Sequence, residues 1–339
     1  MRIFPLLFSR TTAGLLLVGA GAGPPFPVDH KSDASLLVDR GTGLAFTIPA
    51  DESLFFEVIV DIPLVGAISM GTFELLSGTE PYQASVFEAQ EGEAGEAARV
   101  GWVKGNASGS CLNYVLKHEI DLRVLPQEWP RVIYRDTQGG TEHRRRELMY
   151  GTRNGQATSL YRRDGHCTDK SGKRPEHWLA KALWGGERHC SKCKRAAHRD
   201  WRKPTVQEVP ADSVDMLSAI FLARSMVQSG LAEVNFPMLD KDRWWDVTLT
   251  LGAQKLLVTR AGSFECRAVK LTPVLPSGKR EKFKGLFGIH GSLSIWLEKD
   301  TGVPVSIEGV LPAGPLNVGI NLQLTGFRGT PAGFGPVDR

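Results

Sequence analysis

Cysteine and histidine side chains gather between His166 and Trp201, and they are the side chains of this sequence best suited to chemistry. Three of the five cysteines and four of the eight histidines lie there. The segment reads as two copies of one pattern, a His-Cys pair followed by a basic patch, a histidine and a tryptophan: His166, Cys167, His177 and Trp178, then His189, Cys190, Cys193, His198 and Trp201. Thiolates and imidazoles this close together are typical zinc ligands.

The second copy has the spacing of a metal site. The two thiolates of Cys190-x-x-Cys193 and the imidazole of His198 can meet at one tetrahedral ion. A Cys-rich ligand set favours a closed, structural site, whereas a catalytic zinc needs an open position for water. We therefore predict a structural zinc ion whose fourth ligand is Cys167, His177 or His189. The candidate ligands are Cys167, His177, Cys190, Cys193 and His198.

A disulfide within the same cluster is the main alternative. The C-x-x-C pair could bridge internally or exchange with Cys167 in an oxidising compartment. A redox role is disfavoured because no βαβ pattern surrounds the pair, and c-type haem attachment is disfavoured because Lys194 follows Cys193. The other two cysteines, Cys111 and Cys266, lie in strand-like stretches, where they would be buried thiols or, alternatively, bridged to each other.

Positive charge is concentrated around this cluster. Residues 142–203 contain 17 Lys and Arg against 7 Asp and Glu, a net charge of +10, whereas the whole chain carries +4. Such a basic face can meet an anionic glycan, a lipid head group or an acidic protein, and no nucleic acid partner is expected. The candidate contacts are Arg144, Arg145, Arg146, Lys192, Lys194 and Arg195.

The first 22 residues have the organisation of a secretory signal peptide. Met1 to Arg10 carries two arginines, an apolar stretch follows, and Ala20-Gly21-Ala22 offers a small-residue cleavage site. We expect the mature protein to be periplasmic or secreted, with an uncleaved N-terminal membrane anchor as the alternative. Residues 23–51 are punctuated by Gly and Pro and are expected to be irregular.

Alternating apolar and polar residues predict a mainly antiparallel β fold. From Leu54 to Val60 every second side chain is apolar, and similar patterns recur on both sides of the insert. Predicted strands cover 54–60, 67–76, 82–89, 112–121, 131–135, 144–150 and 156–162, then 244–251, 255–259, 262–271, 291–298, 304–310 and 315–325. The expected divisions are a first β half at 52–165, a basic Cys/His insert at 166–203, a helix and second β half at 204–327, and a disordered tail at 328–339.

One helix is predicted after the insert. Asp212 is the expected N-cap, and Asp215 adds negative charge near the favourable end of the helix dipole. Arg224 would pair with one of these two carboxylates. The apolar stripe expected to cover the sheet consists of Leu217, Ile220 and Phe221, with Arg224 on the same face.

Several of these stretches together resemble a known family. The helix carries Asp215-x-x-Ser218-Ala219 and Arg224, a strand reads Gly262-Ser-Phe-Glu-Cys266, and the clearest stretch is Gly291-Ser-Leu-Ser-Ile-Trp-Leu-Glu-Lys-Asp300-x-x-x-Pro304-Val305. This set is similar to the DUF3108 family of exported bacterial proteins, whose role is unassigned. The resemblance spans residues 52–325 apart from the insert. It implies a curved antiparallel sheet or half-barrel, like that of lipoprotein carriers of the envelope, with a helix lying against it.

The sequence leaves three classes of function open. The first is a non-catalytic envelope protein that holds an apolar or amphipathic ligand, such as a lipid, on the curved sheet, with the zinc ion confined to the insert. The second is an interaction module that presents the basic insert to an anionic envelope component. The third is a metal-dependent enzyme, which requires an exchangeable water and a general base. Motifs of P-loop, dinucleotide-binding, serine hydrolase and HExxH metalloprotease type are absent from the sequence.

Overall fold

The computed structural model describes residues 36–39, 45–63, 66–82, 99–111, 114–125, 131–140, 143–166, 199–277, 283, 285, 289–313 and 316–337. The first strands are β1 (Leu36–Asp39), β2 (Ala45–Ile48), β3 (Asp51–Ile62), β4 (Gly66–Pro81), β5 (Arg99–Cys111), β6 (Tyr114–Leu125), β7 (Arg131–Gly140), β8 (Arg144–Arg153) and β9 (Gln156–His166). They are followed by β10 (Arg199–Trp201), β11 (Thr205–Glu208), helix α2 (Met216–Ser229), β12 (Glu233–Asp240), β13 (Arg243–Thr259), β14 (Gly262–Val274), β15 (Leu293–Glu298), β16 (Pro304–Ala313) and β17 (Leu316–Arg328).

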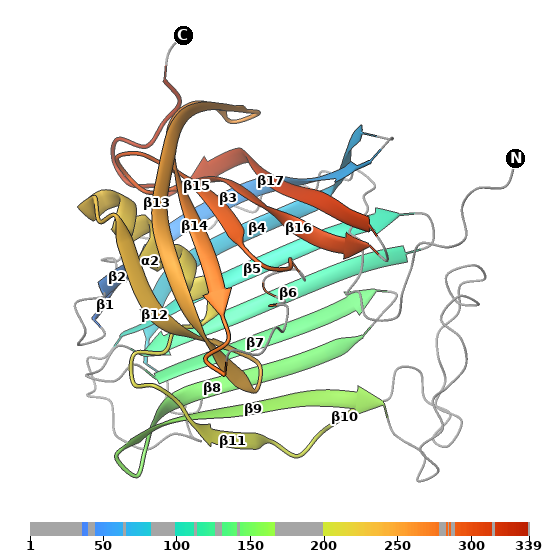
Figure 1. Ribbon diagram of the computed structural model, residues 1–339, viewed down its shortest axis with the longest axis vertical. Coiled ribbons are helices and arrows are strands. Elements are labelled where there is room, and N and C mark those ends of the chain that lie inside the picture. Colours follow the sequence, from blue (N-terminus) through green and yellow to red (C-terminus); the bar gives the residue numbers. More distant parts are fainter. Residues whose placement is uncertain are drawn as a thin grey trace, which may run out of the picture.

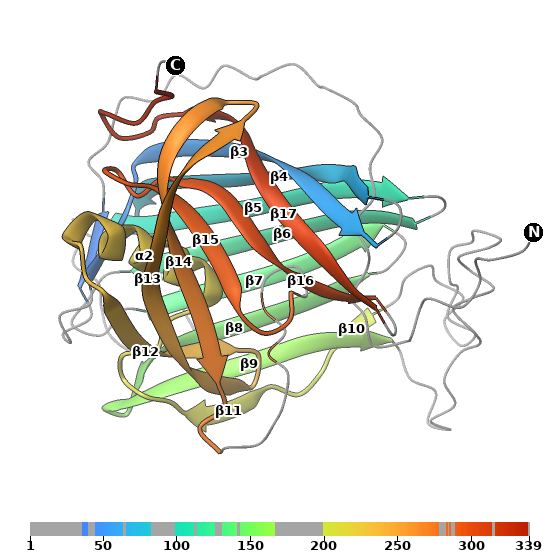
Figure 2. The same ribbon diagram turned by 45° about the horizontal axis from the view of Figure 1, so that its top comes forward.

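One large antiparallel sheet contains all of these strands except β1 and β2, which pair with each other. Its order runs β10-β9-β8-β7-β6-β5-β4-β3-β17-β16-β15-β14-β13-β12, and β11 pairs with β9 beside β10. The sheet bends so that β12–β16 cross over the broad wall formed by β4–β9 (Figures 1 and 2). It does not close, because β12 is not paired with β9, β10 or β11. The predicted fold class, a curved antiparallel sheet with one main helix, is confirmed.

The core lies on the inner, concave face of the sheet. In β3 the side chains of Leu54, Phe56, Val58 and Val60 are buried, while those between them are only partly covered. This is the alternation expected when one face of a sheet packs on a core. Phe56 stacks on Phe73 of β4 at a ring-centroid distance of 5.8 Å, and the same cluster continues onto the helix.

Helix α2 packs against this inner face and is buried along most of its length. Its N-cap is Asp215, not the predicted Asp212. The Asp215 carboxylate accepts hydrogen bonds from the backbone N–H groups of Leu217 and Ser218 at 2.9 and 3.0 Å, which satisfies donors that the first helical turn leaves unpaired. The helix ends at Gly230, whose φ of 69° gives the left-handed conformation common after a C-terminal turn.

The expected partner of Arg224 is also wrong. Its guanidinium forms a bidentate ion pair with the buried carboxylate of Glu52 in β3, at 2.5 and 3.0 Å, and contacts neither predicted aspartate. Arg224 points from the helix toward the sheet. Its partner Glu52 lies far away in the sequence, so spacing along the helix could not predict the pair. The pair joins two elements that lie far apart in the sequence.

Two segments expected to lack regular structure contain described residues that pack on the domain. Within residues 23–51, β1 and β2 form a small antiparallel pair, and Phe46 of β2 stacks on Phe221 of the helix at 6.4 Å. Within residues 328–339, Phe334 stacks on Phe264 at 5.2 Å, and the backbone N–H of Val337 donates to Ser263 at 2.8 Å. Aromatic contacts therefore hold the described parts of both segments on the domain.

Among the described residues, no helix is both long enough and apolar enough to span a membrane.

Candidate ligand-binding cavity

The predicted zinc ligands lie outside the described residues. Cys167, His177, Cys190, Cys193 and His198 all fall within residues 167–198, between the described strands β9 and β10. The two ends of this segment are described, because β10 pairs with the end of β9 and places Arg199 opposite His166. Elsewhere in the described chain, no cluster of three His, Cys, Asp or Glu side chains could hold a metal ion.

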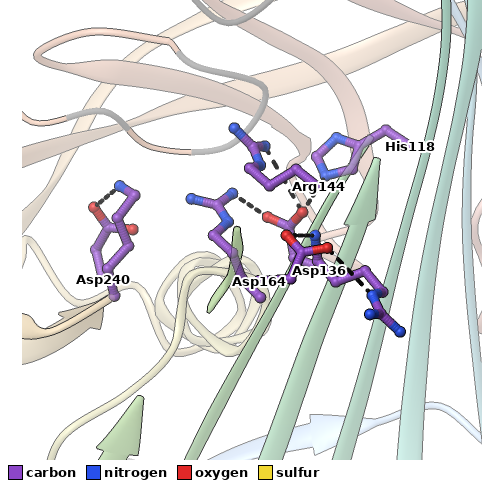
Figure 3. A network of polar contacts seen from close by, with 8 residues as sticks. His118, Asp136, Arg144, Asp164 and Asp240 are labelled. Atoms are coloured by element: carbon purple, nitrogen blue, oxygen red, sulfur yellow. Dashed lines mark hydrogen bonds and ion pairs between the residues drawn. The ribbon is translucent and has the colours of Figure 1, made fainter. Parts of the chain in front are cut away.

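A cluster of charged side chains occupies the inner face where β6, β7 and β8 run side by side. Asp136 of β7 lies opposite Arg146 of β8, and Gln138 lies opposite both Arg144 of β8 and His118 of β6. Side chains at such paired positions share a face of the sheet. Figure 3 shows His118 and Arg144 both directed toward the carboxylate of Asp136.

Asp136 is the centre of this cluster. Its side chain is 1% exposed, it accepts a hydrogen bond from Arg146, and its Oδ1 lies 2.9 Å from His118 Nε2 and 3.8 Å from Arg144 Nη2. Burial alone would raise the pKa of Asp136, but Arg146 and the hydrogen bond from His118 outweigh burial and hold that pKa well below its usual range. The carboxylate is therefore ionised at neutral pH and can only accept, so His118 carries its proton on Nε2.

A cavity opens beside this cluster, between the inner face and the turn that joins β12 to β13. It offers about 60 Å³ to the centres of water-sized molecules, which is room for roughly four waters. Its polar lining includes the carboxylate of Asp215 and the side chains of His118, Tyr134, Asp136, Gln138, Arg144, Arg146, Tyr161, Asp240 and Lys241. The cavity is thus reached by three cationic side chains from two separate parts of the sheet.

The turn at Asp240 and Lys241 forms one wall of the cavity. The Lys241 ammonium pairs with Asp240 at 2.5 Å, and Lys241 has a φ of 62°, an uncommon value for a side chain other than glycine. Burial lowers the pKa of Lys241, although Asp240 partly opposes that shift. In Figure 3 Asp240 lies at the left, apart from the group of side chains around Asp136.

Two phenols complete the polar wall. Burial raises the pKa of Tyr134 well above its ordinary value, and the neighbouring Asp136 raises it further. Burial also raises the pKa of Tyr161. Both side chains therefore stay neutral through the physiological range and are O–H groups that can donate to an anion.

The remaining lining of the cavity is apolar. Ile120, Leu148 and Leu239 are at most 4% exposed, and they stand with Leu116 and with Met216 from the first turn of the helix. The cavity therefore has a charged wall and an aliphatic wall, as expected of a site that holds a molecule with a polar end and an apolar end.

The arginines expected to form a basic surface divide between the two faces of β8. Arg144 and Arg146 point into the cavity, whereas Arg145, which lies between them, pairs with Asp164 on the outer face. A strand turns alternate side chains to opposite faces, so three consecutive arginines cannot form one surface. Lys192, Lys194 and Arg195 lie outside the described residues.

Cys266 is a free, buried thiol in β14, so the alternative bridge to Cys111 is not formed. Its Sγ lies 3.5 Å from the carbonyl oxygen of Phe264. Burial, together with the negative charge of Glu298, raises the pKa of Cys266 to about 12. The thiol is protonated at neutral pH and serves as a small core side chain.

Part of this chain is similar to a protein family that has no assigned role. No curated protein matches the chain. Among solved structures, a match is "Crystal Structure of Beta-barrel-like Protein of Domain of Unknown Function DUF1849 from Brucella abortus", with a TM-score of 0.44, 8% identity, and coverage of 82% of this chain and 97% of that one. Residues 192–321 match the model of the family described as "Protein of unknown function (DUF3108)", which confirms the predicted resemblance over the helix and the strands that follow it.

Proposed function

We propose that the protein is a non-catalytic binding protein for a short amphipathic ligand with an anionic head group. The observation that carries this proposal is the cavity itself, where Arg144, Arg146 and Lys241 converge beside an aliphatic wall. Resemblance to a family of unassigned role adds nothing about the ligand, so the proposal rests on the chemistry of the lining.

The cations favour an anionic head group. Arg146 and Arg144 both form ion pairs with Asp136, Arg144 at the longer distance of 3.8 Å, and Lys241 pairs with Asp240. Arg144 is also the most exposed of the three, at 33% of its side chain. A carboxylate that enters the cavity could therefore take a bidentate contact with Arg144 and hydrogen bonds from the neutral phenols.

The size of the cavity favours a short ligand. Inner-face side chains and α2 fill most of the space under the curved sheet, and the cavity has room for a head group and the first few methylenes only. Each methylene placed against the aliphatic wall contributes about 0.8 kcal/mol.

Thermal unfolding in the presence of matched ligands tests the proposal. Octanoate should raise the melting temperature in a concentration-dependent way because it binds the folded state alone. Octanol has the same chain without the charge and should shift the temperature less. Arg144→Gln should lose most of the octanoate shift, and Arg260→Gln, which removes an exposed arginine on another part of the sheet, should keep it. Equal shifts for acid and alcohol would contradict an anionic head-group site.

We also propose that the protein is exported and that a structural zinc ion closes its insert. The export proposal is supported by the N-terminal sequence, and the zinc proposal by the Cys190-x-x-Cys193 spacing and by the pairing of His166 with Arg199. An insert whose two ends are paired in the sheet can fold as a separate unit. A short polar insert of this kind needs a metal ion or a disulfide for stability. Metal analysis of the exported protein, with a count of free thiols, distinguishes a zinc ion from a disulfide in the insert.

A further inference from the structure

The outer face of β8 and β9 presents a second cationic surface, separate from the cavity. Arg145 of β8 and Arg162 of β9 both reach the indole of Trp201, with guanidinium carbons 4.9 and 4.5 Å from the ring centroid. Trp201 lies opposite Asp164 in the pairing of β10 with β9, on the same face as these two arginines. Figure 1 shows β9 and β10 at the end of the sheet, with β11 beside them.

Two buried carboxylates lie beneath this surface and pair with its arginines, but the guanidinium groups remain exposed to solvent. Glu147 accepts hydrogen bonds from Arg162 and from Arg135, the latter at 2.9 Å, and Asp164 accepts from Arg145 at 3.3 Å. The two acidic residues are only 3% and 4% exposed, whereas the three arginine side chains are 37–49% exposed. The face that meets solvent is therefore positive, because the guanidinium groups cover their counter-charges.

Exposed apolar side chains lie along the edge of the same surface. Trp201 is 38% exposed and Val206 of β11 is 49% exposed. Val206 lies opposite Leu160 in the pairing with β9, which places it on the outer face with Trp201. The link between these two strands carries the exposed Lys203. Cationic and apolar side chains are thus found together at one edge of the sheet.

We propose that this surface docks the protein on an anionic lipid bilayer. Tryptophan is favoured at the boundary between head groups and acyl chains, and Val206 would enter the same zone. Arginine and lysine are attracted to the negative surface of such a membrane. A soluble polyanion would satisfy the arginines and leave Trp201 and Val206 without a partner, so the exposed apolar edge favours the bilayer.

Docking in this way would hold the ligand cavity close to a lipid surface. Leu148 and Tyr161 line the cavity from the inner face of the same two strands whose outer face carries Arg145 and Arg162. The inference does not depend on the cavity's ligand, because it rests on other side chains and on the opposite face of the sheet.

Co-sedimentation of the full chain with vesicles tests the proposal. The protein should bind phosphatidylcholine vesicles that contain phosphatidylglycerol and should not bind vesicles of phosphatidylcholine alone, and the binding should weaken as salt is raised. Lys203→Gln changes an exposed residue and should reduce the affinity about fivefold, the effect of one cation near an anionic membrane. Trp201→Ala should reduce it several-fold, and the exposed Arg260→Gln should leave it unchanged.

Three results would overturn the proposal. Lack of binding to the anionic vesicles is the first. Undiminished vesicle binding by both Lys203→Gln and Trp201→Ala would place the membrane contact elsewhere on the chain. Binding to soluble heparin that Lys203→Gln weakens, without binding to vesicles, would show that the surface recognises a polyanion. Because Lys203 is exposed, its variant remains informative even if Trp201→Ala unfolds the edge strand.

Discussion

Asp136 and Arg146 lie directly opposite each other on neighbouring strands, and their side chains form a buried ion pair on the inner face of the sheet. Removing one partner of such a pair leaves an uncompensated charge in a medium of low dielectric constant. We expect Asp136→Asn to lower the free energy of unfolding by about 3 kcal/mol. Urea denaturation measures this loss.

The matched control for that variant is an ion pair whose arginine is exposed to solvent. Arg260 pairs with Glu57 at 3.2 Å, and its side chain is 73% exposed. Arg260→Gln should change the free energy of unfolding by less than about 0.5 kcal/mol, because solvent screens the charge. Similar losses for both variants would mean that the Asp136 cluster is solvated and contributes no more than a surface pair.

The lowered pKa of Asp136 predicts a loss of stability in acid. The unfolded chain binds a proton at Asp136 near pH 4, whereas the folded protein resists protonation, so the unfolded state holds more protons in this range. The stabilisation is complete above about pH 5 and disappears progressively as the pH falls toward the folded pKa. Urea midpoints at a series of pH values should fall more steeply for the wild type than for Asp136→Asn. Parallel curves would contradict the assigned pKa.

Tyr134 and Tyr161 predict a change in alkali of the opposite sense. Their pKa values are raised in the folded state, so in alkali the unfolded chain loses these phenol protons more readily than the folded protein does. The free energy of unfolding should therefore fall above about pH 10. Tyr134 and Tyr161 should ionise above the usual pH range of a tyrosine when absorbance of the phenolate is followed. Tyr134→Phe should remove one of the late transitions. If that variant loses an early one, Tyr134 is not buried in solution.

The N-cap of the helix can be tested by comparing two aspartates. Besides the two backbone N–H groups, Asp215 Oδ2 accepts from the hydroxyl groups of Ser218 at 2.6 Å and of Tyr150 at 3.0 Å. Asp215→Ala should cost about 2 kcal/mol, since it removes a cap and leaves a buried hydroxyl without its acceptor. Asp212→Ala should cost less than about 0.5 kcal/mol. The reverse ranking would restore the assignment suggested by the sequence alone.

Pairing of His166 with Arg199 leads to a prediction for the insert. If zinc closes it, Cys190→Ser should abolish binding of about one zinc per chain and increase protease cleavage within residues 166–201, while the β domain unfolds as before. Cys266→Ser, at a thiol buried elsewhere, should leave the zinc content unchanged. Protein that lacks metal and has cysteines bridged within the insert would favour the disulfide alternative.

The sequence predicted most strands because their burial alternates, as in β3, and missed those in which it does not. No strand is predicted over Glu233–Asp240. Its Pro237 is tolerated there because β12 is the last strand in the order of the sheet, where a residue without an N–H can be accommodated. Two predicted strands at 244–251 and 255–259 are one long strand, β13, whose register shifts between Leu251 and Gln254. A bulge of this kind interrupts the alternation without ending the strand.

The cavity could not be predicted from the sequence. His118, Asp136 and Arg146 come from three different strands, and they meet only because the register aligns them. The sequence predicts that Arg144, Arg145 and Arg146 share one basic surface, but the alternation of side chains along β8 turns Arg145 to the opposite face. The turn residues Asp240 and Lys241 join the site through curvature of the whole sheet, which no local pattern encodes.

Locating a bound ligand is the most direct test of the proposed cavity. A crystal of the protein grown with 8-bromooctanoate would reveal the bromine by its anomalous scattering and the carboxylate by its density. We predict that the carboxylate contacts Arg144 and that the first methylenes lie against Leu148 and Leu239, with the bromine toward the cavity mouth. An empty cavity at saturating ligand, or a ligand bound only elsewhere on the sheet, would contradict the proposed function.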